Sequence, residues 1–296
     1  RTEKKRRDSG KQAKDRAREL MIAGKTEEAR REFSKAVEIN HEHALALMEA
    51  CRKENVDCIT SMYEADAQLA YLNKIGLVDY VISEDSDLIL FGCSKIVFKL
   101  QLDGSCLLFD SNKLHKTLGT TQEKFSFEKF RRIAILSGCD YLDSLPGIGL
   151  QKASKFMQMT VETDMTKALP KIPSYLNMNK LTVTQEYIEG FLKAEATFKY
   201  MYVYDPVKRK MLRLNEFQNE AEEIQHCSQA GQEIDEDLAY QLALGNINPR
   251  TLVKVANFIP NQTSNGFYDK NVSIWRSDFE ELFKQRHPQP TPKQQK

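Results

Sequence analysis

The sequence has little of what marks secreted, membrane-spanning or repetitive proteins. Its 296 residues include six cysteines, and these show no C-x-x-C spacing. We therefore expect reduced thiols that pack as small core residues, in a reducing compartment, rather than a disulfide framework. No apolar run approaches the ~20 residues of a membrane span, and nothing repeats at the ~34-residue period of a helical solenoid. These absences favour a soluble globular protein with one large domain or two ordinary ones.

Net charge is also small, but it is unevenly distributed. The whole chain carries +1, whereas residues 1–35 hold 13 Lys and Arg against 7 Asp and Glu, which leaves +6 there and −5 in the rest. Such a local excess of positive charge would attract a polyanion. A solvated helical face is the alternative explanation for such a run.

Paired carboxylates are the most informative feature that is present. Glu64 and Asp66 are two residues apart, as are Asp85 and Asp87, and a fifth acid, Asp140, follows later. Two like charges repel by roughly 4 kcal/mol at ~4 Å and an effective dielectric of about 20. A divalent cation would reverse that repulsion, and oxygen-only ligands favour Mg²⁺ or Mn²⁺ over zinc. Phosphoryl transfer is the chemistry that such sites usually serve.

Each acid also has a purely structural explanation. Ser61 stands three residues before Glu64 and could form a capping box with it, which would place the second acid of that pair in the first helical turn. The second pair follows residues 80–82, which are typical of the end of a buried parallel strand, where ligand sites of open α/β sheets lie. Asp140 ends a helical apolar pattern and could be an ordinary helix-end acid. Taken together, the five acids favour a metal site.

The pattern around these acids predicts an α/β fold. We expect strands over residues 56–60 and 78–83, separated by a helix over 65–74, and this alternation implies a parallel sheet with both faces covered. Residues 96–110 alternate apolar and polar around an Asp-Gly pair, which predicts a hairpin. A helix is expected over residues 122–136, and mostly helices over 174–245. From Pro260 the composition predicts a loose tail, although Ile274, Trp275, Phe279 and Leu282 could form one short docking helix.

A glycine-rich turn follows the last acid, in the segment SLPGIGLQKASK at residues 144–155. Gly147 and Gly149 allow the backbone to approach a ligand closely, and the amides that open the next helix can hold a phosphate, with charge from Lys152 and Lys155. Beside a metal cluster this predicts a DNA-backbone clamp, which positions the duplex without reading its sequence. A tight helix-helix connection is the alternative.

These motifs together resemble the flap endonuclease superfamily of structure-specific 5′ nucleases, over residues 1 to about 250. The blocks that carry the resemblance are YEADAQLAYLNK (63–74), EDSDL (84–88), LSGCDYL (136–142), GIGL (147–150), YDPVKRK (204–210) and LALGN (242–246). The whole superfamily shares the short acidic motifs. The Asn-Lys ending of the first block and the last two blocks point to its exonuclease branch.

The resemblance implies a PIN-like parallel-sheet nuclease core with a helical arch and a helix-two-turn-helix DNA-binding extension. It implies two Mg²⁺ ions, for which Mn²⁺ can substitute, bound by Glu64, Asp66, Asp85, Asp87 and Asp140. Residues 147–155 would belong to the helix-two-turn-helix, which grips the uncleaved duplex around K⁺. Backbone carbonyls near Ser137, Ser144 and Ile148 would bind that ion. Arg6 and the neighbouring Arg7 would hold the scissile phosphate from the arch.

The implied domains are a helical arch remnant (1–50), an α/β nuclease core (51–140), a helical helix-two-turn-helix and wrap-around region (141–250) and a largely disordered tail (251–296). The implied function is a metal-dependent 5′ to 3′ double-stranded DNA exonuclease with flap endonuclease activity, in mismatch repair and end resection. The implied partners are duplex DNA with 5′ ends, nicks or flaps, and mismatch-repair proteins. We expect a monomer in the nucleus with no membrane association.

Two alternatives stay open. One is a flap endonuclease of replication, against which no sliding-clamp peptide of the Gln-x-x-Leu-x-x-Phe-Phe type follows the helical part. The other is a non-catalytic DNA-binding or scaffold module. Superfamily members carry roughly eighty residues before the point that matches Arg1, including two further metal-binding aspartates and an arch lysine. We therefore expect this chain to be a fragment that binds duplex DNA weakly and does not cut it.

Overall fold

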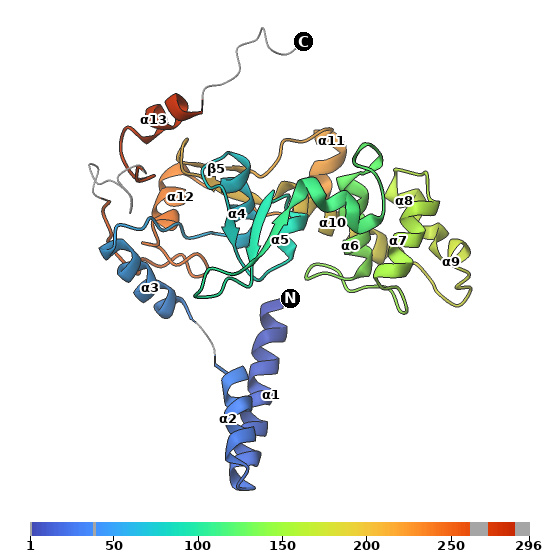
Figure 1. Cartoon of the computed structure of the whole chain (residues 1–296), viewed down its shortest axis with the longest axis horizontal. Helices are drawn as coiled ribbons and strands as arrows, with labels where there is room; N and C mark the ends of the chain where they lie inside the picture. The colour runs from blue at the N-terminus through green and yellow to red at the C-terminus, as the bar shows by residue number, and fades with distance from the viewer. Residues whose placement is uncertain (1, 38–39, 261–271, 288–296) are drawn as a thin grey trace. The chain divides into compact units, whose positions relative to one another are not determined.

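The computed structural model describes residues 2–37, 40–260 and 272–287, with the backbone alone for residues 2–7. The chain divides into two compact units, residues 1–54 and 55–296 (Figure 1). Within the described residues, none of the helices combines the length and apolar character that crossing a bilayer requires.

The first unit is helical. It contains α1 (Thr2–Ile22), α2 (Thr26–Lys35) and α3 (His41–Lys53). α1 and α2 pack against each other through small side chains, since Ala13, Ala17 and Ala29 are all buried. Gly24 has φ +74° in the turn between these two helices, a conformation that L side chains rarely adopt. The prediction of helices over residues 1–50 is confirmed for the described part of this stretch.

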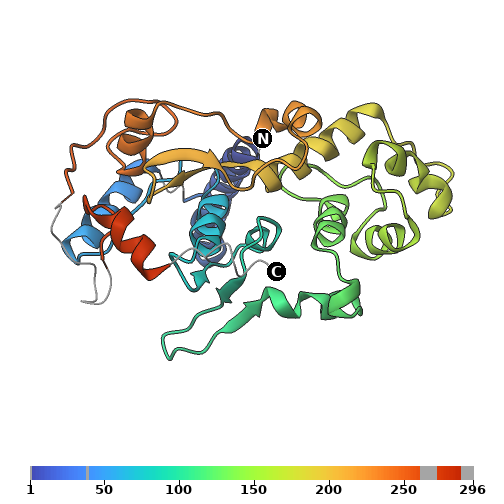
Figure 2. The same ribbon diagram turned by 90° about the horizontal axis from the view of Figure 1, so that it is seen from above.

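The second unit combines two small sheets with short helices. Its elements are α4 (Ala65–Lys74), β1 (Val81–Ile82), α5 (Asp87–Leu90), β2 (Lys95–Phe98), β3 (Leu107–Asp110), η1 (Ser111–Leu118), η2 (Gln122–Lys124), α6 (Phe127–Ser137), α7 (Leu150–Met159), α8 (Met165–Ala168), η3 (Leu169–Lys171), α9 (Ile172–Tyr175), α10 (Gln185–Tyr200), β4 (Tyr202–Asp205), β5 (Lys210–Arg213), α11 (Glu220–Glu223), η4 (Ile224–Gln229), α12 (Glu236–Ala243) and α13 (Phe279–Arg286). Helices α6 to α9 lie toward one end of this unit, and α12 and α13 toward the other (Figures 1 and 2).

The first sheet has the order β1-β2-β3. β1 pairs with β2 in parallel, with Val81 opposite Ile96, and β2 pairs with β3 antiparallel, with Lys95 opposite Asp110. The predicted hairpin is confirmed, and so is the α/β class. The predicted parallel sheet is smaller than expected, because it consists of one parallel pair, and Ile82 of β1 is 65% exposed.

The predicted strand over residues 56–60 is not a strand in the structure, and the one over 78–83 shortens to β1. The backbone of the first stretch finds a different partner, since the Thr60 amide donates to the carbonyl of Ala243 at the end of α12, at 2.9 Å. A backbone group that pairs with a helix end satisfies its hydrogen bond without a neighbouring strand.

The main core lies between the first sheet, α4, α6 and α10. Leu88, Ile96, Ile135, Phe191 and Phe198 are fully or almost fully buried there. α6 begins with a side-chain cap, because the Ser126 hydroxyl accepts from the Lys129 amide at 3.2 Å. The predicted helix over 122–136 thus becomes the 3₁₀ turn η2 followed by α6. This packing fixes the end of α6, from which the chain continues to Asp140.

Residues 272–287 depart from the loose tail expected for 251–296. Trp275 is 3% exposed and Phe279 5%, both in a second apolar cluster with Tyr204 and Tyr240. The docking helix proposed from the sequence is confirmed in part: α13 contains Phe279 and Leu282, whereas Ile274 and Trp275 are buried just before it. Residues 261–271 and 288–296, the rest of the predicted tail after Pro260, lie outside the described residues.

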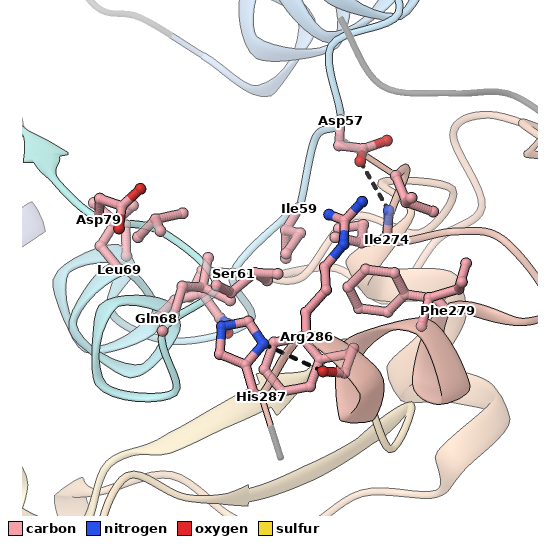
Figure 3. A pocket seen from close by; sticks show the side chains of 18 residues that line it. Asp57, Ile59, Ser61, Gln68, Leu69, Asp79, Ile274, Phe279, Arg286 and His287 are labelled. Carbon is pink, nitrogen blue, oxygen red and sulfur yellow. Dashed lines mark hydrogen bonds between the residues drawn. The ribbon is translucent and has the colours of Figure 1, made fainter. Parts of the chain in front are cut away.

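Polar contacts fix this segment to the core. Asp57 accepts from the Ser273 hydroxyl at 2.7 Å and from the Ile274 amide at 2.9 Å, the second of which is visible in Figure 3. Arg209 donates to the carbonyl of Arg276 at 2.7 Å. A cavity of about 800 Å³ remains between α4 and α13.

Candidate metal centre

The first carboxylate pair stands at the beginning of α4. Glu64 is the N-cap residue, with φ −79° and ψ 123°, but no side chain caps the helix. The capping box that would have explained Ser61 and Glu64 structurally is therefore not formed. Asp66 lies in the first turn, half-buried. Both carboxylates project from a helix N-terminus, where the macrodipole stabilises negative charge.

The second pair follows the carboxyl end of β1, as the sequence predicts. The Asp85 amide donates to the Ser83 hydroxyl at 3.0 Å, and the Asp87 amide donates to Asp85 Oδ1 at 3.0 Å. Asp87 is the first residue of α5. This strand-turn-helix connection fixes the backbone of both acids at the edge of the sheet where ligands bind in open α/β folds.

The fifth acid lies in a tight turn after α6. The Cys139 amide donates to the Leu142 carbonyl at 2.9 Å, and the Leu142 amide donates back at 3.2 Å, which places Asp140 at the tip. Gly138 precedes the turn with φ +101°, and a Cβ there would lie 3.3 Å from the Ser144 amide nitrogen. The turn can close against Ser144 because position 138 is glycine.

Electrostatics show that these three segments meet. The pKa of Asp66 is raised to about 6, by burial first and then by the charges of the other four acids, in the order Asp85, Glu64, Asp87 and Asp140. Burial likewise raises the pKa of Asp87 to about 6, with contributions from Asp85, Asp140 and Glu64. The structure thus brings together all five acids that the sequence singled out.

The chemistry of this donor set fits a hard divalent cation. Within the residues that the structure describes, no three His, Cys, Asp or Glu side chains already lie close enough to hold a metal ion. The carboxylates nevertheless share one neighbourhood and disfavour each other's charged forms. Oxygen donors of this kind are the preferred ligands of Mg²⁺ and Mn²⁺, whose charge would remove the repulsion. The five acids are therefore suited to such an ion, but their side chains are not arranged as a closed ligand shell.

Three side chains near the five acids were not predicted from the sequence. The pKa of Tyr141 is raised by burial and then by Glu64, Asp87 and Asp66, so its ring lies beside the acids. Tyr63 and Gln68 flank the first pair and make long-range hydrogen bonds. A polar residue such as Gln68 on the inner face of an amphipathic helix is the signal that could have identified it.

The glycine-rich segment opens α7. Gly149 is the N-cap residue, and among the described residues no heavy atom lies within 4 Å of a Cβ built there. Lys152 and Lys155 are exposed on the helix, and Lys152 Nζ is 3.5 Å from Met178 Sδ. Gly147 has φ +74°, so the turn needs its glycine. The helix N-terminus is open, as a phosphate clamp requires.

The other predicted site residues are those expected at the K⁺ site and at the scissile phosphate. Ser137 ends α6, with its hydroxyl donating to the Ile133 carbonyl at 2.7 Å, and Ile148 is 4% exposed. Gly138 brings the end of α6 beside Ser144, while the K⁺ role of these carbonyls stays a prediction. Arg6 and Arg7 lie on α1, and their side chains are outside the described residues.

An α/β core that gathers five acids around the end of a parallel strand defines a class of candidate metal-dependent proteins. The chain matches the model of the XPG I-region over residues 55–140, which include all five acids. It is similar to the protein named Exonuclease 1 of Drosophila melanogaster, with 50% identity over 94% of this chain and 39% of that protein. Exonuclease 1 of Xenopus laevis is 42% identical over 87% of this chain and 35% of its own length.

Among solved structures, flap endonuclease-1 from Methanococcus jannaschii is 18% identical with a TM-score of 0.44, covering 70% of this chain and 57% of that one. The chain spans less than half the length of the curated relatives named above.

Proposed function

We propose that this chain is the nuclease region of a metal-dependent 5′ to 3′ double-stranded DNA exonuclease that also cuts 5′ flaps. The observation that carries the proposal is the convergence of five carboxylates from three separate segments, where burial first and the neighbouring acids second raise the pKa values of Asp66 and Asp87 to about 6. Clustered carboxylates with raised pKa values are typical of functional sites, where a bound cation relieves their repulsion. The similarity to proteins named Exonuclease 1 supports the choice of reaction.

The acids would act as ligands. Glu64, Asp66, Asp85, Asp87 and Asp140 would hold two Mg²⁺ ions. When bound, these ions would supply an activated water and stabilise the leaving oxygen of the phosphodiester. Asp66 and Asp87 have to be deprotonated to bind metal, and a pKa of about 6 leaves both largely ionised at neutral pH.

Other residues would hold the DNA. The open N-terminus of α7 at Gly149, with Lys152 and Lys155 on its surface, would bind the backbone of the uncleaved duplex. Carbonyls near Ser137, Ser144 and Ile148 would bind K⁺ in the same element, and Arg6 and Arg7 on α1 would approach the scissile phosphate. This division corresponds to an arch within 1–50, a core within 51–140 and a duplex grip within 141–250. We place the activity in the nucleus, in mismatch repair and end resection.

The test is cleavage of a 5′-recessed, labelled duplex by the full natural chain that contains these residues. We expect nucleotides to be released from the 5′ end in Mg²⁺, and release to stop in EDTA. Asp87→Ala should abolish cleavage and leave duplex affinity within a few-fold, because the acid holds metal and the grip lies elsewhere.

Glu84→Gln is the matched control. Glu84 is a neighbouring exposed acid, but its side chain accepts from the Lys99 amide at 2.6 Å, so this variant should keep its activity. Near-normal turnover by Asp87→Ala, or cleavage that continues in EDTA, would refute the proposed function.

A further inference from the structure

Helix α4 carries two of the five acids, and its first turns are attached to a distant part of the same unit. Gln68 lies one turn after Glu64 and is 3% exposed. Its Nε2 donates to the Tyr204 carbonyl at 2.8 Å, and its Oε1 accepts from the Tyr204 amide at 2.8 Å. Tyr204 is in β4, paired on its other side with Met211 of β5. The amide of Gln68 thus occupies the free edge of β4 as a neighbouring strand would.

A second attachment precedes the acids. The Tyr63 hydroxyl accepts from the Gln232 amide at 2.9 Å and lies 3.1 Å from the Gln232 carbonyl, to which it donates. Its ring lies against Gly231, where a Cβ would come within 2.6 Å of the ring and where φ is +78°. A side chain at position 231 would therefore displace the ring or strain the turn.

These two attachments enclose the carboxylate pair. Tyr63 directly precedes Glu64, and Gln68 follows Asp66 by two residues, so the backbone that carries both acids is fixed on either side. The acids repel each other and the pair that follows β1, and that repulsion would move a free first turn of α4 away from the cluster. The hydrogen bonds to Tyr204 and Gln232 oppose this movement.

We propose that Gln68, assisted by Tyr63, is a positioning residue that holds Glu64 and Asp66 where a divalent ion can bind them. The inference rests on the proposed function, because it concerns the same site. Residues that orient metal ligands from behind affect metal affinity about 10- to 100-fold when they are removed. A purely structural hydrogen bond would instead affect stability alone.

A buried asparagine elsewhere in the unit provides the matched control. Asn246 is also 3% exposed, and its side chain also spans backbone groups, donating to the Phe258 carbonyl at 2.9 Å and accepting from the Phe258 amide at 2.6 Å. It follows α12 and has no part in the carboxylate cluster. Gln68→Ala and Asn246→Ala each remove a buried amide that bonds to backbone, and Asn246 also donates to Gln241 Oε1 at 2.9 Å, so the control should lower stability at least as much.

The experiment measures Mn²⁺ binding to the full natural chain by the electron paramagnetic resonance signal of the free ion, beside urea unfolding without metal. We expect Gln68→Ala to weaken Mn²⁺ binding about tenfold and Asn246→Ala to leave it within twofold. Duplex affinity in EDTA should be unchanged in both. Tyr63→Phe, which keeps the ring and loses the hydroxyl, should weaken Mn²⁺ binding by a few-fold and serves if Gln68→Ala does not fold.

The outcomes separate the two ideas. Equal Mn²⁺ affinity in the Gln68 and Asn246 variants, with wild-type affinity in Tyr63→Phe, would overturn the positioning role while cleavage by the wild type leaves the proposed function standing. A wild-type chain that neither binds Mn²⁺ nor cuts DNA would overturn both. Weaker Mn²⁺ binding in the Gln68 and Tyr63 variants alone would support the inference.

Discussion

Acidification should weaken metal binding steeply, because two of the proposed ligands hold their protons unusually tightly. The pKa values of Asp66 and Asp87 are raised to about 6, from an ordinary value of 3.8, by burial first and then by the neighbouring acids. A divalent ion binds the ionised forms, so each protonated carboxyl must lose its proton before it can act as a ligand.

The size of the effect follows from those two values. At about pH 7.5 nearly all of each group is ionised, whereas at about pH 5.5 a group with a pKa of about 6 is ionised in only about a quarter of the molecules. Two such groups together reduce apparent affinity about fifteenfold between the two conditions. Carboxyls with their ordinary pKa would change it by less than a tenth.

Calorimetric titration with Mn²⁺ across this range measures the effect without any need for turnover. Asp87→Asn provides the control, because it removes one titrating group and one of the charges that raise the pKa of Asp66. The variant should bind more weakly at neutral pH and depend less on pH. If wild-type affinity were the same at about pH 5.5 and 7.5, the carboxylates would not share one site and the reasoning would fail.

The same groups set the sign of the stability change in the metal-free protein. Because their folded-state pKa lies above the value of 3.8 in an unfolded chain, the native state binds protons more tightly between about pH 4 and 6. Their contribution to stability is fully present below about pH 4 and is lost as the pH rises to about 6. Added Mg²⁺ should restore stability on the alkaline side, since it binds the native ionised form.

Three further predictions concern the DNA contacts and the core. Gly149→Val should weaken duplex binding more than single-strand binding while the circular dichroism spectrum stays unchanged, because the described structure leaves room for the valine side chain but a bound phosphate would meet it. Equal loss of affinity for both substrates would show that the turn is merely structural. Arg6→Ala should lower turnover by more than it raises the substrate constant, because a cation at the scissile phosphate acts on charge that develops in the transition state. If the variant only bound DNA more weakly, and added salt removed the difference from wild type, Arg6 would be an ordinary phosphate contact. Trp275→Ala should lower the free energy of unfolding by about 3 to 5 kcal/mol in urea, because the ring is 3% exposed; a loss below about 1 kcal/mol would show that residues 272–287 are not part of the folded core.

The carboxylate cluster could be predicted because its information is local. Asp85 and Asp87 follow a short apolar run, and strands that end in acids put them at one edge of a sheet. Helix α4 was predicted to its last residue, since its apolar period, its acidic first turn and Gly76 all agree. The structure adds the proximity of Asp140, whose tight turn depends on a contact between Gly138 and Ser144.

Long-range pairing is what the sequence could not provide. Residues 56–60 have the composition of a strand, yet the Thr60 amide bonds to Ala243, and no local pattern encodes that partner. The same limit applies to Gln68, whose two bonds reach Tyr204, 136 residues away. Composition also favoured a loose tail where Trp275 is buried, because the polar residues around it outnumber the few apolar ones that dock.

The raised pKa values and the attachments of α4 are two consequences of one physical problem. A fold that collects five acids must hold them against mutual repulsion before any cation arrives, and burial of Asp66 and Asp87 makes their ionisation harder still. Hydrogen bonds from α4 to the backbone of other segments can supply the opposing force. Pairing the acids with cationic side chains would also oppose the repulsion, but it would occupy the carboxylate oxygens that have to bind metal. Gln68 can do this because it is uncharged and satisfies both backbone groups of Tyr204, so it restrains α4 without competing for the metal. A lysine in its place could not accept from the Tyr204 amide and would bring a charge into a position that is 3% exposed.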